Sequence, residues 1–546
     1  MTTSSAATHK VLIAGQWRES DSTDTFQAED PRAAAAIAEN YPVSSWAECE
    51  AALDAATTAF EQMRSLSADQ IAGFLEKYAD RIEARSAEIC ELASKETALP
   101  VEPRLASGEL PRTTGQLRQA ATAARTHSWA QPVIDTNTNI RSCYGAIGPV
   151  AVFGPNNFPL AFGSISGGDF AAAIAAGNPV IAKANTMHPG VTRLLAEEAQ
   201  AAAEETGMPS GTVQLIYRMS HADGERLAKD ERLSAIGYTG SRNAGLKLKA
   251  AADSVGKPSY LELSSVNPVV MLPGALNERG QEIADELTGS CLMGTGQFCT
   301  NPGLIILQDN EAAQKFRDSI ASGFGQAGTG TLLSKSGQEG LSAAIATLQN
   351  AGAAVVCGGE VGGGEGYSFN NTVMEVSGSG FLANSQELQT EAFGNSTLLV
   401  MTASLEESVE VVKALEGNLT GCVYSAKDGS DDSAYDSIAP WLRQKVGRML
   451  NDKMPTGVAV CSAMNHGGPF PATGHPGFTA VGLPGSIVRF SMLQCYDNIR
   501  AHRLPSILQD KNPGQVWRLV DGQWTQADTK VASAKRALKQ NVWFAS

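Results

Sequence analysis

The chain has 546 residues, of which 42 are basic and 57 acidic, and its formal net charge is −15. This charge argues against a nucleic acid as the main partner, because binding to phosphates needs a basic face. Hydrophobic residues make up 43% of the chain and charged residues 18%, which is typical of a globular protein and excludes a disordered one.

The predicted elements begin with helices and then alternate. Residues 44–130 are rich in alanine with helical spacing, and they predict several amphipathic helices. Beyond them, short apolar runs predict strands at 146–154, 178–184, 211–217, 233–240 and 258–264, with helices at 160–177, 190–207, 223–230 and 241–254. Such alternation predicts βαβ units and a parallel, doubly wound sheet, which binds ligands at the carboxyl ends of its strands.

A second α/β portion is predicted from about residue 268 to residue 450. Within it, residues 323–328 match GxGxxG, a pattern of dinucleotide-binding loops. A helical stretch precedes this match, whereas a dinucleotide loop follows a strand and opens a helix, so we interpret it as a connection. The tail from about residue 505 carries Trp517, Trp524 and Trp543, and we expect it to pack on the body of the protein.

The cysteines and the N-terminus bear on the compartment. The nine cysteines are scattered without a CxxC pair, so neither a disulfide framework nor a metal site is expected. The N-terminus has no basic stretch followed by an apolar one, and we therefore expect a cytoplasmic protein. Residues 142–168 carry no charge, but their prolines and glycines would leave polar backbone groups unsatisfied in lipid, so no membrane partner is expected.

Three residues stand out as candidates for chemistry. Cys299 lies in GTGQFCTNPG, where flanking glycines allow backbone amides to approach its sulfur; the alternative is a buried structural cysteine. Glu262 ends an apolar strand, where a carboxylate is costly to bury unless it is paired or functional. Asn157 follows a strand in FGPNNFP, and simple turn chemistry is its alternative.

Together these segments resemble the aldehyde dehydrogenase superfamily. The resemblance extends from about residue 11 to residue 500 and is carried, in the family's order, by FGPNNFP (153–159), YTGS (238–241), LELSS (261–265), GQFCT (296–300) and TEAFGN (390–395). It implies an α/β fold with a Rossmann-type cofactor domain, an α/β catalytic domain and a small oligomerisation hairpin. The implied division is a dinucleotide-binding domain at 1–130 and 148–264, a catalytic domain at 265–477, an oligomerisation segment at 131–147 and 478–499, and a C-terminal tail at 500–546.

The resemblance also implies a mechanism. Cys299 would attack an aldehyde carbon as a thiolate and form a thiohemiacetal, while the Asn157 amide and the Cys299 N–H hold the oxyanion. Hydride would then pass to the nicotinamide and leave a thioester. Glu262 would act as the general base for the water that hydrolyses this thioester.

For the cofactor, the resemblance assigns Lys183 to the adenosine ribose and Gly240 with Ser241 to the pyrophosphate, at the start of a helix. Glu391 and Phe393 correspond to the residues beside the nicotinamide ribose. NAD-preferring members usually carry a glutamate where this chain has Thr186, and a hydroxyl can donate to a 2′-phosphate that a carboxylate would repel. With Arg218 as a second cation, or as a plain surface arginine, we expect NADP as the cofactor, with NAD possible.

Further segments are similar to the NADP-linked α-ketoglutaric semialdehyde dehydrogenases, namely LPRTTGQLR (110–118), ELSSVNPV (262–269), PTGVAV (455–460), GGPFPAT (467–473) and CYDN (495–498). The match departs at TGHPG (473–477), near the expected substrate mouth. Arg112 or Arg118 could meet a substrate carboxylate, although ion pairing on a helix surface is the favoured role for either. We expect a small-molecule aldehyde as the substrate and a homodimer or homotetramer.

Three alternatives stay open at this point. The first is a broad or fatty aldehyde dehydrogenase. The second is a relative that transfers the acyl group to coenzyme A, although Glu262 favours water as the acceptor. The third is a non-catalytic binding protein on the same fold, although the joint presence of Asn157, Glu262 and Cys299 argues against it.

Overall fold

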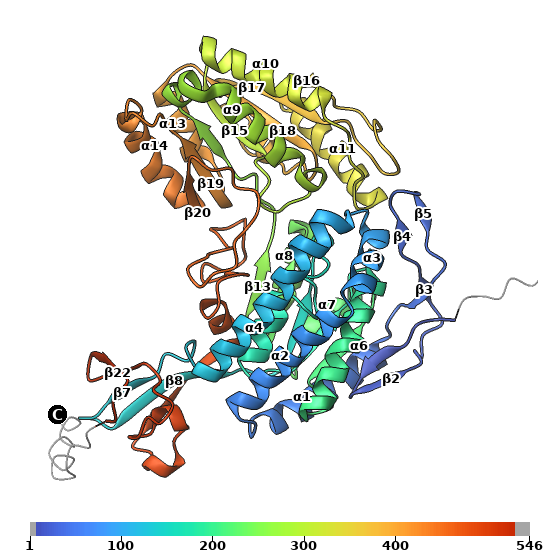
Figure 1. Ribbon diagram of the computed structural model, residues 1–546, viewed down its shortest axis with the longest axis vertical. Helices are drawn as coiled ribbons and strands as arrows, with labels where there is room; N and C mark the ends of the chain where they lie inside the picture. Colours follow the sequence, from blue (N-terminus) through green and yellow to red (C-terminus); the bar gives the residue numbers. More distant parts are fainter. Residues whose placement is uncertain (1–6, 530–546) are drawn as a thin grey trace, which may run out of the picture.

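The computed structural model describes residues 7–529, which form two α/β lobes and a smaller sheet that projects from the first lobe (Figure 1). The first lobe holds a seven-stranded sheet of order β13-β12-β9-β10-β11-β1-β2. Its parallel strands are β9 (Val150–Phe153), β10 (Val180–Lys183), β11 (Val213–Ile216), β12 (Ala235–Thr239) and β13 (Ser259–Glu262). These five parallel strands confirm the predicted parallel sheet. Two antiparallel strands, β1 (Val11–Ile13) and β2 (Gln16–Arg18), extend one of its edges.

Helices before and between these strands complete the first lobe. They are α1 (Trp46–Met63), α2 (Ala68–Ala84), α3 (Ser86–Thr97), α4 (Leu110–Thr126), α5 (Gly168–Ala175), α6 (Pro189–Thr206), α7 (His221–Lys229) and α8 (Arg242–Asp253). A π-helical stretch at Val101–Glu109 leads into α4. The helices α6, α7 and α8 agree with the predicted ones within about two residues, the usual uncertainty of a helix end.

The predicted helix at 160–177 is wrong in its first half. Residues 160–167 form turns, and the helix begins only at Gly168. The backbone N–H groups of Leu160 and Ala161 donate to the buried Glu109 carboxylate, at 2.8 and 2.9 Å, instead of entering a helical ladder. A long-range acceptor thus competes with the local helical pattern, and it holds the chain beyond Asn157 against the start of α4.

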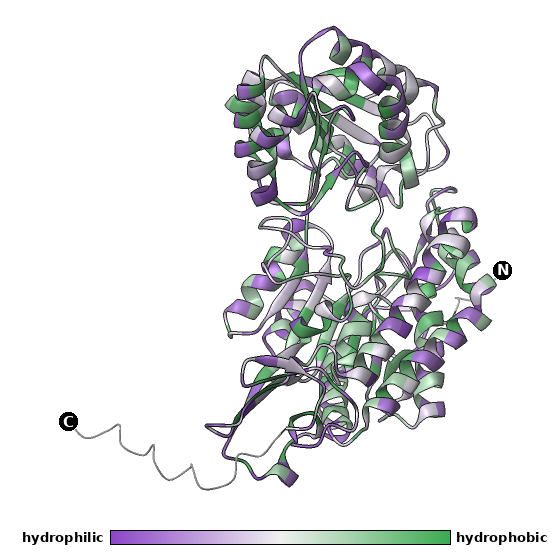
Figure 2. Cartoon of the chain, turned by 60° about the vertical axis from the view of Figure 1, so that its left-hand side comes forward, coloured by the Kyte–Doolittle hydropathy of each residue, from purple (hydrophilic) through white to green (hydrophobic). Residues whose placement is uncertain are grey.

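The second lobe contains another seven-stranded sheet, of order β16-β17-β18-β15-β14-β19-β20. The strands are β14 (Val269–Met271), β15 (Leu304–Gln308), β16 (Ala354–Cys357), β17 (Thr372–Ser377), β18 (Ser396–Thr402), β19 (Asn418–Tyr424) and β20 (Val446–Asn451). The helices are α9 (Pro273–Leu292), α10 (Glu311–Gln326), α11 (Lys335–Asn350), α12 (Gly378–Ala383), α13 (Leu405–Ala414) and α14 (Asp432–Lys445). Figure 2 shows hydrophobic residues along the strands and hydrophilic ones on the outer helices. The GxGxxG match lies at the end of α10, so it opens no helix.

A five-stranded sheet of order β21-β8-β7-β22-β23 forms the projecting part. Its strands are β7 (Val133–Asp135), β8 (Ile140–Ala146), β21 (Ser491–Asp497), β22 (Arg518–Val520) and β23 (Gln523–Thr525). The tail does pack on the body, because β22 pairs with β7. Its contact does not rest on tryptophans, since Trp517 and Trp524 are exposed and Trp543 lies outside the described residues.

One buried side chain ties the projecting sheet to the first lobe. The Asn178 Oδ1 accepts hydrogen bonds from the N–H groups of Ile147 and Gly148, between β8 and β9. Its Nδ2 donates to the carbonyls of Ala173 and Phe490, the latter directly before β21. This one residue thus hydrogen-bonds to four backbone groups and satisfies polar atoms that the core shields from water. Within residues 7–529, no helix is long and apolar enough to cross a membrane.

Candidate active site

Five of the seven sequence-predicted cofactor residues lie at the carboxyl ends of the first sheet. The strand β9 lies between β10 and β12, so the chain order reverses beside it and leaves a crevice at the strand ends. A cleft of about 1390 Å³ opens at this point. Among the residues that line it are Lys183, Thr186, Arg218, Gly240 and Ser241.

The cleft suits a negatively charged ligand. Lys183 ends β10, and none of residues 7–529 accepts a hydrogen bond from its ammonium group. Burial, and then the positive charge of Arg218, lower the pKa of Lys183 to about 8. Ser241 caps the start of α8, where backbone N–H groups favour an anion. A cleft of this size, with a helix start and with Lys183 and Arg218 among its cations, fits a dinucleotide cofactor.

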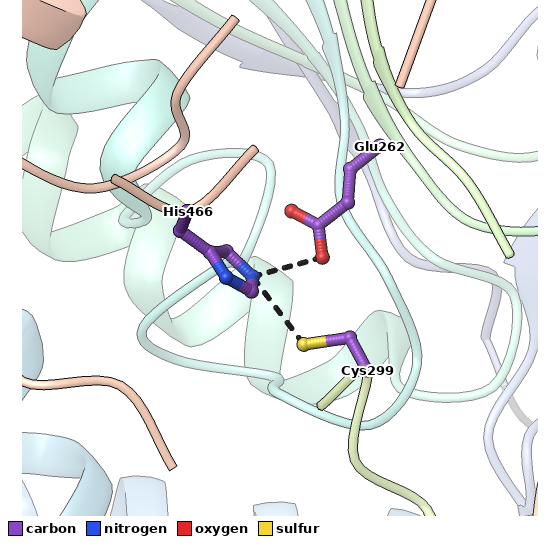
Figure 3. A group of neighbouring side chains, drawn as sticks. All are labelled: Glu262, Cys299 and His466. Carbon is purple, nitrogen blue, oxygen red and sulfur yellow. Dashed lines mark hydrogen bonds and ion pairs between the residues drawn. The ribbon is translucent and has the colours of Figure 1, made fainter. Parts of the chain in front are cut away.

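Three side chains from distant parts of the chain meet at the second cluster (Figure 3). The Cys299 Sγ lies 3.3 Å from Nε2 of His466, and the same Nε2 lies 3.0 Å from Oε1 of Glu262. Glu262 and His466 are buried, whereas Cys299 keeps partial exposure. Cys299 thus keeps some contact with solvent, while Glu262 and His466 are shielded from water.

Backbone pairing between the end of β13 and the segment after His466 places Glu262 next to His466. Glu262 is the last residue of β13, and its neighbour Leu263 donates its N–H to the carbonyl of Ala472 at 2.8 Å. The segment after His466 therefore runs along the edge of β13. The sequence reasoning missed His466; the available signal was its position directly before GGPFPAT, one of the segments that carry the resemblance.

The electrostatics around Cys299 oppose its ionisation. Burial first, and then the negative charge of Glu262, raise the pKa of the Cys299 thiol well above its usual range, while Arg112 acts in the lowering direction. A thiolate therefore needs a proton acceptor within reach, and His466 Nε2 is one. Among residues 7–529, nothing donates a hydrogen bond to the buried Oε2 of Glu262, so this oxygen is free to accept a proton from water.

Asn157 hydrogen-bonds to the loop that carries Cys299. Asn157 follows β9, and its Nδ2 donates to the carbonyl of Gln297 at 2.9 Å, two residues before Cys299. The Asn157 carbonyl in turn accepts from Arg104 at 2.9 Å. No acceptor within residues 7–529 takes the backbone N–H of Cys299. An oxyanion beside the sulfur can therefore be met by this N–H and by the second Asn157 N–H.

The loop that carries Cys299 is fixed from the second lobe. The buried Asn267 donates through Nδ2 to the carbonyls of Cys299 and Asn301, at 2.9 and 2.8 Å. Its own backbone N–H donates to Oδ1 of Asn418 at 3.1 Å, in β19. Two buried asparagines thus connect the second sheet to the backbone of Cys299 and Asn301.

Glu391 and Phe393 lie beside the Cys299 loop, away from the large cleft. They border a small cavity together with Phe298. Burial raises the pKa of Glu391 to about 7, although hydrogen bonds from Ser265 and Ser264 lower it. The two loops touch at Gly296, which has a φ of +69° and where a Cβ would lie 2.0 Å from the carbonyl oxygen of Gly394. Only glycine permits this approach.

Glu262, Cys299 and His466 could also coordinate a metal ion. The ligand atoms of Glu262, Cys299 and His466 all lie within 4.8 Å of one another. Zn²⁺ binds thiolate, imidazole and carboxylate at such spacings. A bound ion would occupy the sulfur and block its use as a nucleophile.

A known family matches most of the chain. Residues 17–439 match the aldehyde dehydrogenase family. The chain belongs to this family. It is 37% identical over 528 residues to alpha-ketoglutaric semialdehyde dehydrogenase 2 of Azospirillum brasilense, covering 94% of this chain and 98% of the relative. It is 36% identical over 500 residues to an alpha-ketoglutaric semialdehyde dehydrogenase of Acinetobacter baylyi, covering 88% and 92%.

Solved structures agree on the fold. Aldehyde dehydrogenase 21 of Physcomitrella patens superimposes with a TM-score of 0.76 at 19% identity, over 91% of this chain and 100% of that one. An aldehyde dehydrogenase of Bacillus cereus reaches 0.77 at 20% identity, over 90% and 96%. The fold expected from the sequence, that of an aldehyde dehydrogenase, is confirmed, and the enzyme is an NAD(P)-dependent aldehyde dehydrogenase.

The contact between Cys299 and His466 predicts how the thiol reacts. In His466→Ala, the alkylation of Cys299 by iodoacetamide near neutral pH should slow about tenfold or more, because the raised thiol pKa leaves little thiolate without the acceptor. Mass spectrometry of the peptide that carries Cys299 measures the rate apart from the exposed Cys461 and Cys495, and His502→Ala, at an exposed residue in Ala501–Arg503, is the matched control. An unchanged rate in His466→Ala would show that the imidazole does not take the thiol proton.

Proposed function

We propose that this aldehyde dehydrogenase oxidises α-ketoglutaric semialdehyde to 2-oxoglutarate, with NADP as its cofactor and Cys299 as its nucleophile. The chemistry is supported by one observation, the contact of Cys299 with His466 and of His466 with Glu262. The choice of substrate is supported by the two relatives of 36% and 37% identity, both of which are named for α-ketoglutaric semialdehyde.

The first stage is attack on the aldehyde. In the tautomer protonated at Nδ1, His466 Nε2 accepts the thiol proton, and the resulting imidazolium is stabilised by the Glu262 carboxylate at 3.0 Å. The thiolate sulfur bonds to the carbonyl carbon, and the oxygen becomes an alkoxide. The backbone N–H of Cys299 and the Asn157 amide donate to this oxygen, and each such donor contributes about 3 kcal/mol in comparable sites.

The second stage releases the acid. When bound, NADP supplies a hydride acceptor, so that the thiohemiacetal on Cys299 becomes a thioester. The Oε2 of Glu262, which no described residue uses as an acceptor, takes a proton from water as the water attacks the thioester carbon. The carboxylic acid leaves, and the cysteine sulfur is restored. The free Oε2 favours water over coenzyme A as the acyl acceptor.

The preference for NADP is supported by the charges at the cleft. Lys183 and Arg218 are its cations beside Thr186, where a carboxylate would repel a 2′-phosphate. Gly240 and Ser241 at the start of α8 would hold the pyrophosphate. By the resemblance, Glu391 with Phe393, which lie beside the Cys299 loop and outside this cleft, would contact the nicotinamide ribose. The residues present thus fit the phosphorylated dinucleotide.

A broad or fatty aldehyde dehydrogenase is the second candidate. The cluster beside Cys299 is strongly aromatic and includes Phe158, Phe162, Phe298 and Phe478, which would suit an apolar chain. The names of the relatives favour the shorter, charged aldehyde. The two candidates differ at the end of the pocket far from Cys299, where a charged aldehyde needs a partner for its carboxylate and an apolar aldehyde needs an apolar surface.

We also propose the domain division and the assembly expected from the sequence. The segments 131–147 and 478–499 contribute β7, β8 and β21 to the projecting sheet. The strand β21 lies at the edge of this sheet and exposes Met492 and Leu493. An apolar edge strand is a natural contact for a second copy, as a homodimer or homotetramer requires.

The proposed substrate and cofactor are tested by one panel. We expect kcat/KM for α-ketoglutaric semialdehyde to exceed that for an uncharged aldehyde of equal length by about tenfold or more, and NADP to exceed NAD by a similar factor. Formation of reduced cofactor is measured with short, long and carboxylate-bearing aldehydes. A preference for long apolar aldehydes would favour the second candidate, and a higher efficiency with NAD would refute the assignment of the cofactor.

The lowered pKa of Lys183 predicts a pH dependence of cofactor binding. Below about 8 the ammonium is charged and attracts the 2′-phosphate, whereas above this value it becomes neutral. The affinity for adenosine 2′,5′-bisphosphate should therefore fall as the pH rises from about 7 to about 9, a range in which the phosphate stays dianionic. Calorimetry measures it; Lys183→Met should flatten the dependence, and an equally steep fall in this variant would exclude Lys183 as its source.

The two stages can be separated by two substitutions. Glu262→Gln keeps an acceptor for His466 but cannot accept the proton from water, so we expect a burst of about one NADPH per active site and then slow turnover. Cys299→Ser should abolish both phases. Rapid-mixing absorbance of NADPH measures them. Oxidation by Cys299→Ser at the parent rate, or unchanged steady turnover in Glu262→Gln, would contradict these roles.

A further inference from the structure

Arg112 lies against the aromatic cluster that borders the reactive sulfur. It belongs to the first turn of α4, and its Cζ lies 4.8 Å from the ring centre of Phe162 and 5.6 Å from that of Phe158. The Phe162 ring in turn lies 5.6 Å from the ring of His466. The charges of Cys299 and Glu262 both act on the Arg112 guanidinium. The cation therefore belongs to the wall of the site in which the aldehyde must bind.

The guanidinium lacks the partner that a shielded cation needs. Its Nε and Nη2 are shielded from water, and within residues 7–529 neither donates a hydrogen bond. No carboxylate of the described residues forms an ion pair with it. The neighbouring Arg104, by contrast, is paired with Glu109 at 2.6 Å. Arg448 donates to the Pro455 carbonyl at 2.6 Å.

The two arginines that the sequence left open are separated by their partners. Arg118 lies further along the same helix and binds Glu83 and Asp80 on the surface, so ion pairing on a helix surface is its role. Arg112 makes no such pair, and its half-buried side chain rests on aromatic rings. Of these two arginines, only Arg112 is thus available for an anionic ligand at this site.

A guanidinium that is shielded from water and has no anionic partner is destabilised, and an anionic ligand can relieve this destabilisation. Burial lowers the pKa of Arg112, because a cation is destabilised when water is withdrawn. The faces of two phenylalanine rings offset part of this cost. A carboxylate would offset more, since the planar guanidinium can donate two parallel N–H bonds to its two oxygens.

We propose that Arg112 binds the carboxylate of the aldehyde substrate and so determines the preference for short aldehydes that end in a carboxylate. The inference rests on the proposed function and deepens it, because it names the group that distinguishes such aldehydes from apolar ones. The aromatic rings contact the methylene groups of the substrate, and the guanidinium pairs with its far end while the aldehyde carbon meets Cys299.

The test compares substrates in matched variants. Arg112→Met keeps length and apolar contact but removes the charge, and the ratio of kcat/KM for α-ketoglutaric semialdehyde over pentanal should fall by about ten- to a hundredfold, mainly through KM. Arg112→Lys should recover part of the ratio, since it keeps the charge but not the two-pronged geometry. Arg118→Met, on the same helix, should leave the ratio at the parent value.

A second measurement does not depend on turnover. The product 2-oxoglutarate carries the same carboxylate, and it should slow the alkylation of Cys299 by iodoacetamide in the parent and in Arg118→Met but not in Arg112→Met. In Arg112→Met, kcat/KM could fall equally for both aldehydes while 2-oxoglutarate still protects Cys299 from alkylation. This result would mean that Arg112 acts on the thiolate, and it would overturn the proposal. An unchanged ratio overturns it as well.

The outcomes also separate this inference from the proposed function. If the parent prefers succinic semialdehyde to α-ketoglutaric semialdehyde and Arg112→Met loses the preference for charged aldehydes, the proposed substrate fails while the role of Arg112 stands. If the parent prefers α-ketoglutaric semialdehyde and Arg112→Met keeps that preference, the role of Arg112 alone fails. If the parent prefers uncharged aldehydes and 2-oxoglutarate gives no protection, both fail.

Discussion

The site depends on a carboxylate, Glu262, that lies close to the Cys299 thiol and opposes its ionisation. Glu262 raises the pKa of Cys299 through its negative charge, and burial acts in the same direction. His466 lies in contact with both, so a proton that leaves the sulfur creates an imidazolium beside an existing carboxylate. The charge that opposes a free thiolate thus stabilises the product of the proton transfer, because opposite charges at hydrogen-bond distance attract strongly in a shielded site.

This arrangement requires three parts of the chain to meet, and the fold is organised around their meeting. Glu262 ends a strand of the first sheet, Cys299 lies on a loop held by Asn267 of the second lobe, and His466 comes from the segment that runs back along β13. The contact of Gly296 with Gly394 joins the GQFCT and TEAFGN segments in the same place. Each part is rigid through backbone hydrogen bonds, so the side chains need little reorganisation to react.

The sequence predicts the features that depend on local patterns and fails where distant residues intervene. The parallel sheet and the helices α6 to α8 were predictable, because apolar runs and helical spacing are local. The predicted helix at 160–177 failed in its first half because Glu109 accepts hydrogen bonds from backbone amides that a helix would use. The motifs gave Cys299, Glu262 and Asn157, but His466 carries no pattern of its own. Arg112 and Arg118 look alike in sequence, and only their partners in the fold distinguish them.

Unpaired cations are the common feature of the two proposed binding regions. The net charge of −15 repels an anionic cofactor and an anionic aldehyde at a distance, but physiological salt screens such repulsion beyond about 8 Å. Binding is then decided by the groups that lie within contact. Lys183 at the cleft and Arg112 at the aromatic wall are both left without a carboxylate in the described structure, whereas Arg104 and Arg118 are neutralised by their own. A cation that the fold leaves unpaired in a shielded place is costly to the free protein, and this cost makes the matching anion the better ligand.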